Sequence, residues 1–96
     1  MSEKKAITRE WTFLSNHGHV LVHISQDPEA RIRDIAQAVG ITERSTQLIL
    51  ADLEAAGYLT TTRVGRRNNY KVNSNLKFRH PSEARKPISA LLKIFT

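Results

Sequence analysis

The feature that most constrains the fold is one glycine, Gly40, which lies between two stretches with a helical pattern of apolar residues. Ile35, Ala36 and Val39 precede it at the spacing of one helix face, and they predict a short helix over residues 33–39. Gly40 can then supply the positive φ that many helix C-termini require. Because Ala36 is small, a second helix can cross the first at close range.

The second helix follows after a tight turn. We expect Ile41 to anchor this turn in the core and Thr42 to be the N-cap of a helix that runs to about Ala56. The residues on its inner face are Ile49, Leu50 and Leu53. Residues 35–49 thus have helix-turn-helix spacing, in which the exposed first turn of the second helix can enter the major groove of DNA.

Further elements are expected on both sides of this pair. An earlier helix begins near Ser15 or Asn16, either of which can cap it. Two strands, over residues 58–64 and 70–72, are rich in β-branched and aromatic residues. The link between them, residues 65–69, contains the Gly and Asn residues that hairpin turns favour.

The C-terminal segment predicts an amphipathic helix. Its apolar residues recur at i, i+3, i+4 and i+7, and they are Ile88, Leu91, Leu92 and Phe95. Pro87 either starts this helix or kinks it, because proline lacks the N–H that a helix interior needs. The expected order is helix, helix, turn, helix, strand, strand, helix, which is an α+β fold that is mainly α.

The charge of the chain favours a polyanionic partner. Fifteen Lys and Arg against nine Asp and Glu give a net charge of +6, which suits DNA, RNA or an acidic membrane surface. No acidic residue occurs between Glu54 and Glu83. The cations in that interval are Arg63, Arg66, Arg67, Lys71, Lys77 and Arg79. Such a one-sided distribution indicates a surface that meets phosphate.

The predicted DNA contacts lie on the outer face of the second helix of the pair and on the hairpin. Arg can pair with guanine and Gln with adenine, whereas Glu43 either accepts from a cytosine amine or favours the helix N-terminus. The hairpin arginines can grip the backbone or enter the minor groove, and the asparagines beside them donate to phosphate or shape the turn. The predicted contacts are Thr42, Glu43, Arg44, Ser45, Gln47, Leu48, Arg63, Arg66, Arg67, Asn68, Asn69 and Lys71.

Residues 11–95 resemble the winged helix-turn-helix regulators of the MarR-like and ArsR-like group. The similarity is carried by residues 40–45 and 51–59, which resemble the recognition helix and its exit, by residues 64–70, which resemble the wing, and by residues 11–17 and 79–81. The resemblance implies a three-helix core, a two-stranded wing and a C-terminal helix. It also implies sequence-specific binding of double-stranded DNA as a homodimer, with terminal helices commonly forming the dimer contact.

Three positions depart from the pattern of that group. Thr46 stands where Val is usual, which weakens the core slightly or leaves a hydroxyl to bond the backbone. Leu48 stands on the exposed face where a basic residue is common, so that one expected phosphate contact is missing. Pro87 interrupts a helix that runs unbroken in relatives.

We divide the chain into a flexible arm (1–10), a winged helix-turn-helix domain (11–74), and a connector with a C-terminal helix (75–96) that serves dimerisation. The predicted dimer contacts are Trp11, Leu14, Ile88, Leu91, Leu92 and Phe95. The C-terminal stripe can also pack on its own domain. Only Lys93 is basic among residues 88–96, which is few for binding an anionic membrane.

Other classes of site find little support. The chain has no cysteine, which excludes disulfides and thiolate metal sites. His19 and His23 are one helical turn apart, but a chelating site needs a third ligand and only the distant His80 remains, so no metal or cofactor is expected. His17 is expected in the core with a satisfied ring nitrogen.

No phosphate-binding loop, nucleophile elbow or Cys/His pair is present, so an enzyme is not expected. No apolar run approaches the roughly 20 residues of a membrane span, and the N-terminus does not resemble a signal peptide, which predicts a cytoplasmic protein.

These features predict a sequence-specific transcriptional regulator that binds double-stranded DNA as a homodimer. The alternative is a winged-helix module without sequence preference, either an architectural DNA-binding protein or a protein-interaction adaptor. The basic hairpin favours DNA over the adaptor, and RNA binding lacks an aromatic stacking surface. The sequence does not name an effector, and a pocket for one would have to lie at the dimer interface.

Overall fold

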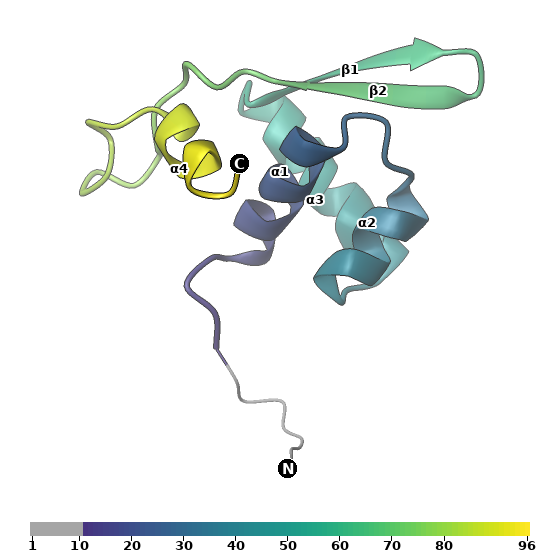
Figure 1. The fold of residues 1–96 in the computed structure, drawn as a ribbon, viewed down its shortest axis with the longest axis horizontal. Coiled ribbons are helices and arrows are strands. Elements are labelled where there is room, and N and C mark those ends of the chain that lie inside the picture. The colour runs from purple at the N-terminus through teal and green to yellow at the C-terminus, as the bar shows by residue number, and fades with distance from the viewer. Residues whose placement is uncertain (1–10) are drawn as a thin grey trace.

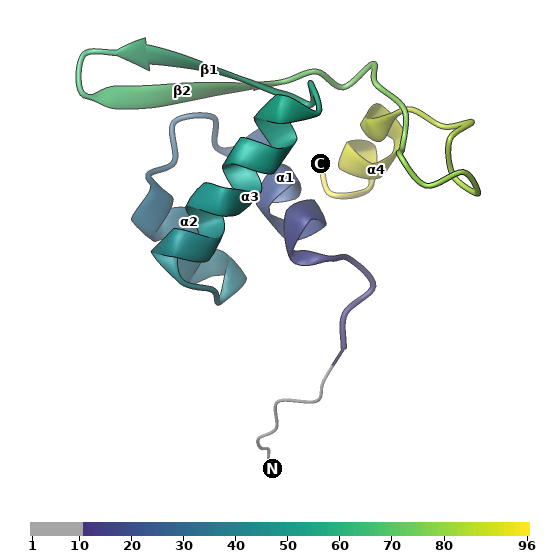
Figure 2. The same cartoon turned by 180° about the vertical axis from the view of Figure 1, so that it is seen from behind.

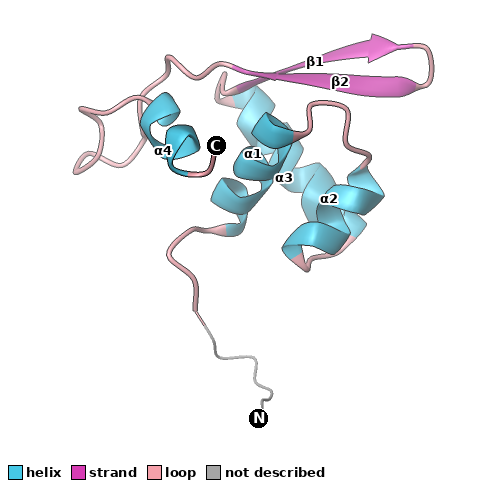
Figure 3. Cartoon of the chain, viewed as in Figure 1, coloured by secondary structure: helices cyan, strands magenta, loops and turns pink. Residues whose placement is uncertain are grey.

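The computed structural model describes residues 11–96, so the predicted arm over residues 1–10 lies outside the described residues. The elements in chain order are α1 (Asn16–Gln26), α2 (Ile32–Val39), α3 (Glu43–Ala55), β1 (Leu59–Val64), β2 (Arg67–Val72) and α4 (Ile88–Ile94), as Figure 1 and Figure 3 show. This is the expected order, and the mainly helical α+β fold is confirmed.

The ends of the first three helices are set by local side chains. Ser15 caps α1, since its Oγ accepts a hydrogen bond from the Gly18 amide at 3.2 Å. Gly40 ends α2 in the left-handed region, with φ of 86°. Thr42 caps α3, and its Oγ1 accepts from the Ser45 amide at 2.9 Å. The sequence predicted the turn between α2 and α3 correctly because each of these signals is local.

The core lies where the three helices meet. Val20, Ile24 and Ile35 are fully buried, and α3 adds the three apolar residues expected on its inner face. Thr46 is buried with them, and its Oγ1 donates to the carbonyl of Thr42 at 2.9 Å. Of the two consequences expected for this departure, the hydroxyl bonded to the backbone is the one observed.

The strands form an antiparallel hairpin with a shorter turn than expected. Val64 pairs with Arg67, which leaves only Gly65 and Arg66 in the turn. Gly65 has φ of 62°, and both favoured two-residue hairpin turns need a positive φ at this first position. The predicted link over residues 65–69 was therefore too long, and its asparagines belong to β2 and do not shape the turn.

A buried tyrosine anchors the hairpin to the helices. Tyr70 is 4% exposed, and its amide donates to the carbonyl of Pro28 in the loop between α1 and α2, at 2.8 Å. Leu59, at the start of β1, is buried in the same core. Beyond these anchors the hairpin projects past the helices (Figure 1).

The C-terminal helix begins directly after Pro87, which is its N-cap residue. Pro87 therefore starts the helix and does not kink it, and Ala84 falls in the preceding turn region. Ile88 and Leu92 are buried in the core that the first three helices form. Within residues 11–96, no helix is long and apolar enough to cross a membrane.

Candidate nucleic-acid interface

The outer face of α3 is open along its length. In the view of Figure 2, α3 crosses the front of the molecule, and none of the other helices and strands within residues 11–96 lies in front of it. Glu43, Arg44 and Gln47 are exposed there, and Leu48 is 57% exposed. Two of the predicted DNA contacts, Thr42 and Ser45, already hydrogen-bond to each other at the helix cap. The Thr42 hydroxyl donates to the Ser45 Oγ at 3.0 Å, in addition to accepting from the Ser45 amide.

The hairpin carries a concentrated positive charge. The exposed cations on its strands and turn are Arg63, Arg66, Arg67 and Lys71. Arg63 lies opposite Asn68 in the strand register, and its Nε donates to the carbonyl of Gly65 at 3.4 Å. Asn68 and Asn69 are half-buried in β2, and the Asn68 amide lies 3.4 Å from the Tyr70 hydroxyl.

The helix face and the hairpin line one groove on the same side of the molecule. A depression of about 180 Å³ is lined by Gln47, Ala51 and Glu54 from α3 and by Thr61 and Asn68 from the hairpin. Cross-strand pairing places Thr61 with Tyr70 and Arg63 with Asn68 on the hairpin face that turns towards the helices. A rod-shaped polyanion laid along α3 would therefore meet the hairpin as well.

A second depression, of about 320 Å³, adds an arginine that the sequence did not predict as a contact. Arg31, the residue before α2, lines it together with Arg66 and Arg67 of the hairpin. Glu29 also lines it, and its Oε1 lies 3.5 Å from Nη1 of Arg67. Arg31 was missed because it is far from the hairpin in sequence, and only folding brings the two together. Its position just before a helix was the one local signal.

The histidines of α1 make polar contacts. Nε2 of His17 lies 2.8 Å from Oδ2 of Asp52 on α3, and about half of the His17 side chain is exposed. The satisfied ring nitrogen was expected, but the core position was wrong, because the first turn of α1 extends past the apolar core. Nε2 of His19 lies 3.1 Å from the Thr12 hydroxyl. Within residues 11–96, no group of three or more His, Asp or Glu side chains is placed to hold a metal ion.

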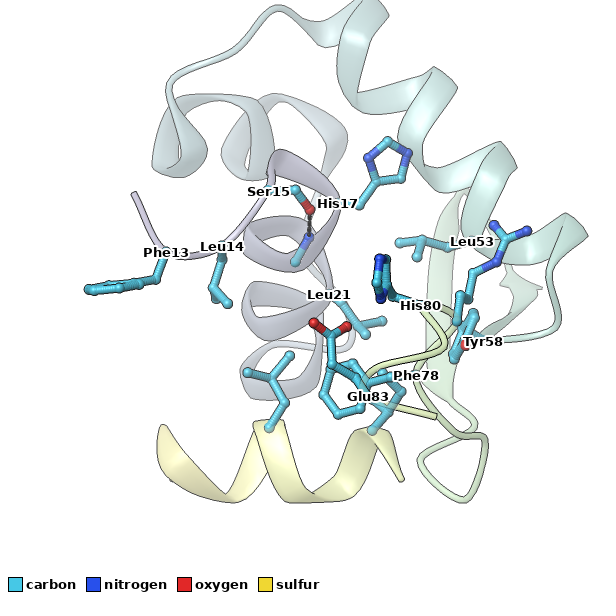
Figure 4. Close-up of a pocket in the computed structure, with 14 residues that line it drawn as sticks. Phe13, Leu14, Ser15, His17, Leu21, Leu53, Tyr58, Phe78, His80 and Glu83 are labelled. Carbon is cyan, nitrogen blue, oxygen red and sulfur yellow. Dashed lines mark hydrogen bonds between the residues drawn. The ribbon is translucent and has the colours of Figure 1, made fainter. Parts of the chain in front are cut away.

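An apolar cavity lies away from the hairpin turn, between α1, α4 and the connector (Figure 4). It measures about 370 Å³, and Leu21, Leu53 and Phe78 line it together with His80 and Glu83.

The predicted dimer contacts fall into two groups. Ile88 and Leu92 are buried in the chain's own core, and Leu14 and Leu91 are half-buried. Trp11 and Phe95 are 75% and 45% exposed. The exposed apolar surface also includes a residue that the sequence did not single out, Phe13, which is 93% exposed and packs edge-to-face on Trp11 with ring centroids 5.0 Å apart.

The sequence and the fold were compared with those of known proteins. Residues 15–60 match the family model described as winged helix-turn-helix DNA-binding. A solved structure with the same fold is that of MepR, described as a transcription regulator of the Staphylococcus aureus multidrug efflux pump MepA. The TM-score is 0.55 and the sequence identity 24%, over 83% of this chain and 56% of that one. No curated protein matches the sequence.

The chain thus spans little more than half the length of MepR, and at this identity the likeness is one of fold. The family match covers all three core helices and ends just inside β1, so it includes both halves of the helix-turn-helix. The chain therefore has the winged helix-turn-helix fold, and residues 15–60 are similar to the DNA-binding family of that description, which confirms the expected resemblance.

Proposed function

We propose that this chain is a sequence-specific transcriptional regulator that binds double-stranded DNA as a homodimer. The observation that carries the proposal is the shared groove between Gln47 and Ala51 of α3 and Asn68 of the hairpin. With α3 in the major groove, the hairpin lies over the flanking backbone or minor groove.

The two parts of the surface have different tasks in this proposal. Arg44 and Gln47 carry the hydrogen-bonding groups that distinguish base pairs, with guanine and adenine as their matching bases. Arg63, Arg66 and Arg67 supply charge to phosphate, which adds affinity without regard to sequence. Arg31 extends this second group, because it faces the same depression as the hairpin arginines.

Dimerisation belongs to the opposite part of the molecule. Trp11, Phe13 and Phe95 leave apolar surface open near α1 and α4, which lie beside each other and away from the hairpin turn (Figure 1). A two-fold pair joined there presents two α3 helices and two hairpins to a two-fold DNA site.

The test begins with selection of bound duplexes from fragments of the source genome. Affinity is then measured for a selected duplex and a scrambled one at a fixed salt concentration. We expect Arg44→Ala to weaken the selected duplex by roughly 5- to 150-fold and to change the scrambled one little, which relaxes base preference. Arg66→Ala should weaken both alike and reduce the steepness of the log–log salt dependence by about 0.9.

Arg85→Ala is the matched control, since Arg85 is an exposed arginine in the connector. It should leave the ratio of the two affinities unchanged. Equal losses on both duplexes from Arg44→Ala and Arg66→Ala would contradict the division of tasks. A wild-type chain that binds both duplexes equally would instead support the architectural alternative.

A further inference from the structure

The residues of α3 that point furthest from the core form an unusual row. Arg44, Leu48, Ala51 and Ala55 follow one another at i, i+4, i+7 and i+11, so they share one helix face. All four are exposed, and they lie opposite the buried residues of the helix, which include Thr46 and Leu53. The row holds one cation, at its N-terminal end, and is apolar beyond it.

Leu48 is the only large apolar side chain in this row. It is 57% exposed, whereas Ile49 and Leu50 beside it are each 7% exposed. A single exposed leucine is common on protein surfaces. This one, however, lies one turn after Arg44 on the very face that the proposed function turns to DNA.

We propose that Leu48 reads the 5-methyl group of a thymine in the major groove, in the register after the base that Arg44 contacts. The proposal rests on the proposed function and deepens it, since it names a base for one position of the site. Among the groups exposed in the major groove, the thymine methyl is the apolar one that an aliphatic side chain can contact favourably. A phosphate contact is not open to leucine.

Two features of the helix support close approach to the base edges. Ala51 and Ala55 follow Leu48 on the same face, and neither projects beyond its methyl group, so the helix can lie deep in the groove. The surrounding charge also favours DNA over a protein partner. Arg44 precedes Leu48, and Arg63 lies opposite Asn68, which lines the groove into which Ala51 and Gln47 face.

The test replaces thymine by deoxyuridine, one position at a time, in a duplex selected by the wild-type chain. This change removes only the methyl group and keeps every Watson–Crick hydrogen bond. We expect one thymine in each half-site at which the change weakens wild-type binding by about fourfold, from roughly 0.8 kcal/mol per buried carbon group and 1.4 kcal/mol per factor of ten. Leu48→Ala should bind the thymine and deoxyuridine duplexes equally.

Two further variants complete the design. Leu48→Met keeps a flexible apolar side chain and should retain the preference for thymine. Ile94→Ala removes a similarly exposed aliphatic side chain at the end of α4, 71% exposed, and should retain it in full.

The inference is overturned if no thymine methyl affects wild-type binding, or if Leu48→Ala keeps the preference. Either result leaves the proposed function standing, because specific binding to the selected duplex has then already been measured. If no duplex is bound more tightly than a scrambled one, the proposed function fails and this inference fails with it.

Discussion

Thr46 fills a site without solvent contact, and the two branches of its side chain have separate effects. Its methyl group packs among the apolar residues of the core, while its Oγ1 donates to the Thr42 carbonyl at 2.9 Å. That carbonyl also accepts the Thr46 amide at 3.0 Å, as helix geometry requires. Loss of the hydroxyl would therefore leave no acceptor without a partner.

We predict that two substitutions at this position differ in their effect on stability. Thr46→Val keeps the branched shape and should change the free energy of unfolding by less than about 1 kcal/mol in either direction. The change is small because no polar group is left without a hydrogen-bond partner. Thr46→Ser keeps the hydroxyl but empties the volume of one methyl group and should destabilise by about 1 kcal/mol. Urea denaturation of both variants measures the difference. If Val destabilises more than Ser, the hydroxyl and not the methyl group holds α3 in place.

Gly40 offers a second test at the residue scale. A methyl group added there would meet no atom within 4 Å, so space is not the limit. The φ of 86° is the limit, and we expect Gly40→Ala to destabilise by about 1–2 kcal/mol through the backbone alone. Gly40→Asn should cost clearly less, since Asn tolerates the left-handed region. Equal losses for Ala and Asn in urea denaturation would contradict this reasoning.

At the scale of elements, one acidic residue, Glu29, lies close enough to the hairpin to lower its affinity for phosphate in the proposed complex. Glu29 lies 3.5 Å from Arg67 and lines the depression that Arg31 and Arg66 share. Both side chains of the pair are at least half exposed, so the ion pair itself stabilises the fold little. In the proposed complex with DNA, the carboxylate would nevertheless compete with phosphate for Arg67 and repel the DNA backbone.

We therefore predict that Glu29→Gln increases affinity for every duplex, selected or scrambled. The increase should be severalfold at low salt and should shrink as salt rises, because the interaction is electrostatic and screened. Glu83→Gln removes the same charge from the connector and serves as the matched control. Titration of both variants at two salt concentrations checks the prediction. An equal gain from Glu83→Gln would mean that net charge alone is responsible.

The elements also show what sequence can and cannot predict. The caps at Ser15 and Thr42 and the turn at Gly40 were predicted correctly, because each depends on residues within four positions. The hairpin turn was predicted too long, because cross-strand pairs such as Arg63 with Asn68 set its length. The structure exposes the hairpin arginines and the outer residues of α3 that the sequence offered as DNA contacts, but the approach of Arg31 to the hairpin depends on contacts between distant segments.

At the scale of the whole molecule, one group of exposed apolar residues lies away from the hairpin turn. The hairpin cations and the open face of α3 lie at one side, whereas Trp11, Phe13 and Phe95 lie near α1 and α4. The end of α4 lies close to the end of α1, and the Gln26 side-chain amide donates to the carbonyl of Phe95 at 2.8 Å. Ile88 and Leu92 fix α4 from inside the core, which leaves Phe95 available to contact a second copy in the proposed dimer.

This separation predicts that dimerisation and folding can be uncoupled. Trp11→Ser or Phe95→Ser should shift the chain from dimer to monomer in sedimentation equilibrium at micromolar concentration, with little change in the unfolding midpoint, since both side chains are exposed. Ile88→Ala should instead lower stability by about 2–5 kcal/mol, because that side chain is buried in the monomer. Val64→Ser, an exposed apolar residue at the far end of the hairpin, should leave the dimer intact.

Affinity for an isolated half-site distinguishes a variant that is folded but monomeric from one that is misfolded. In the proposed dimer each half-site is contacted by one α3 and one hairpin, so affinity for an isolated half-site should stay at the wild-type value. Affinity for the full two-fold site should fall by a factor of roughly 10²–10⁴, because the second binding event is no longer intramolecular. Loss of half-site binding as well would show that the substitution had damaged the fold. A wild-type chain that sediments as a monomer, with equal affinity for half and full sites, would remove the dimer from the proposed function and leave α3 and the hairpin as a single DNA-binding unit.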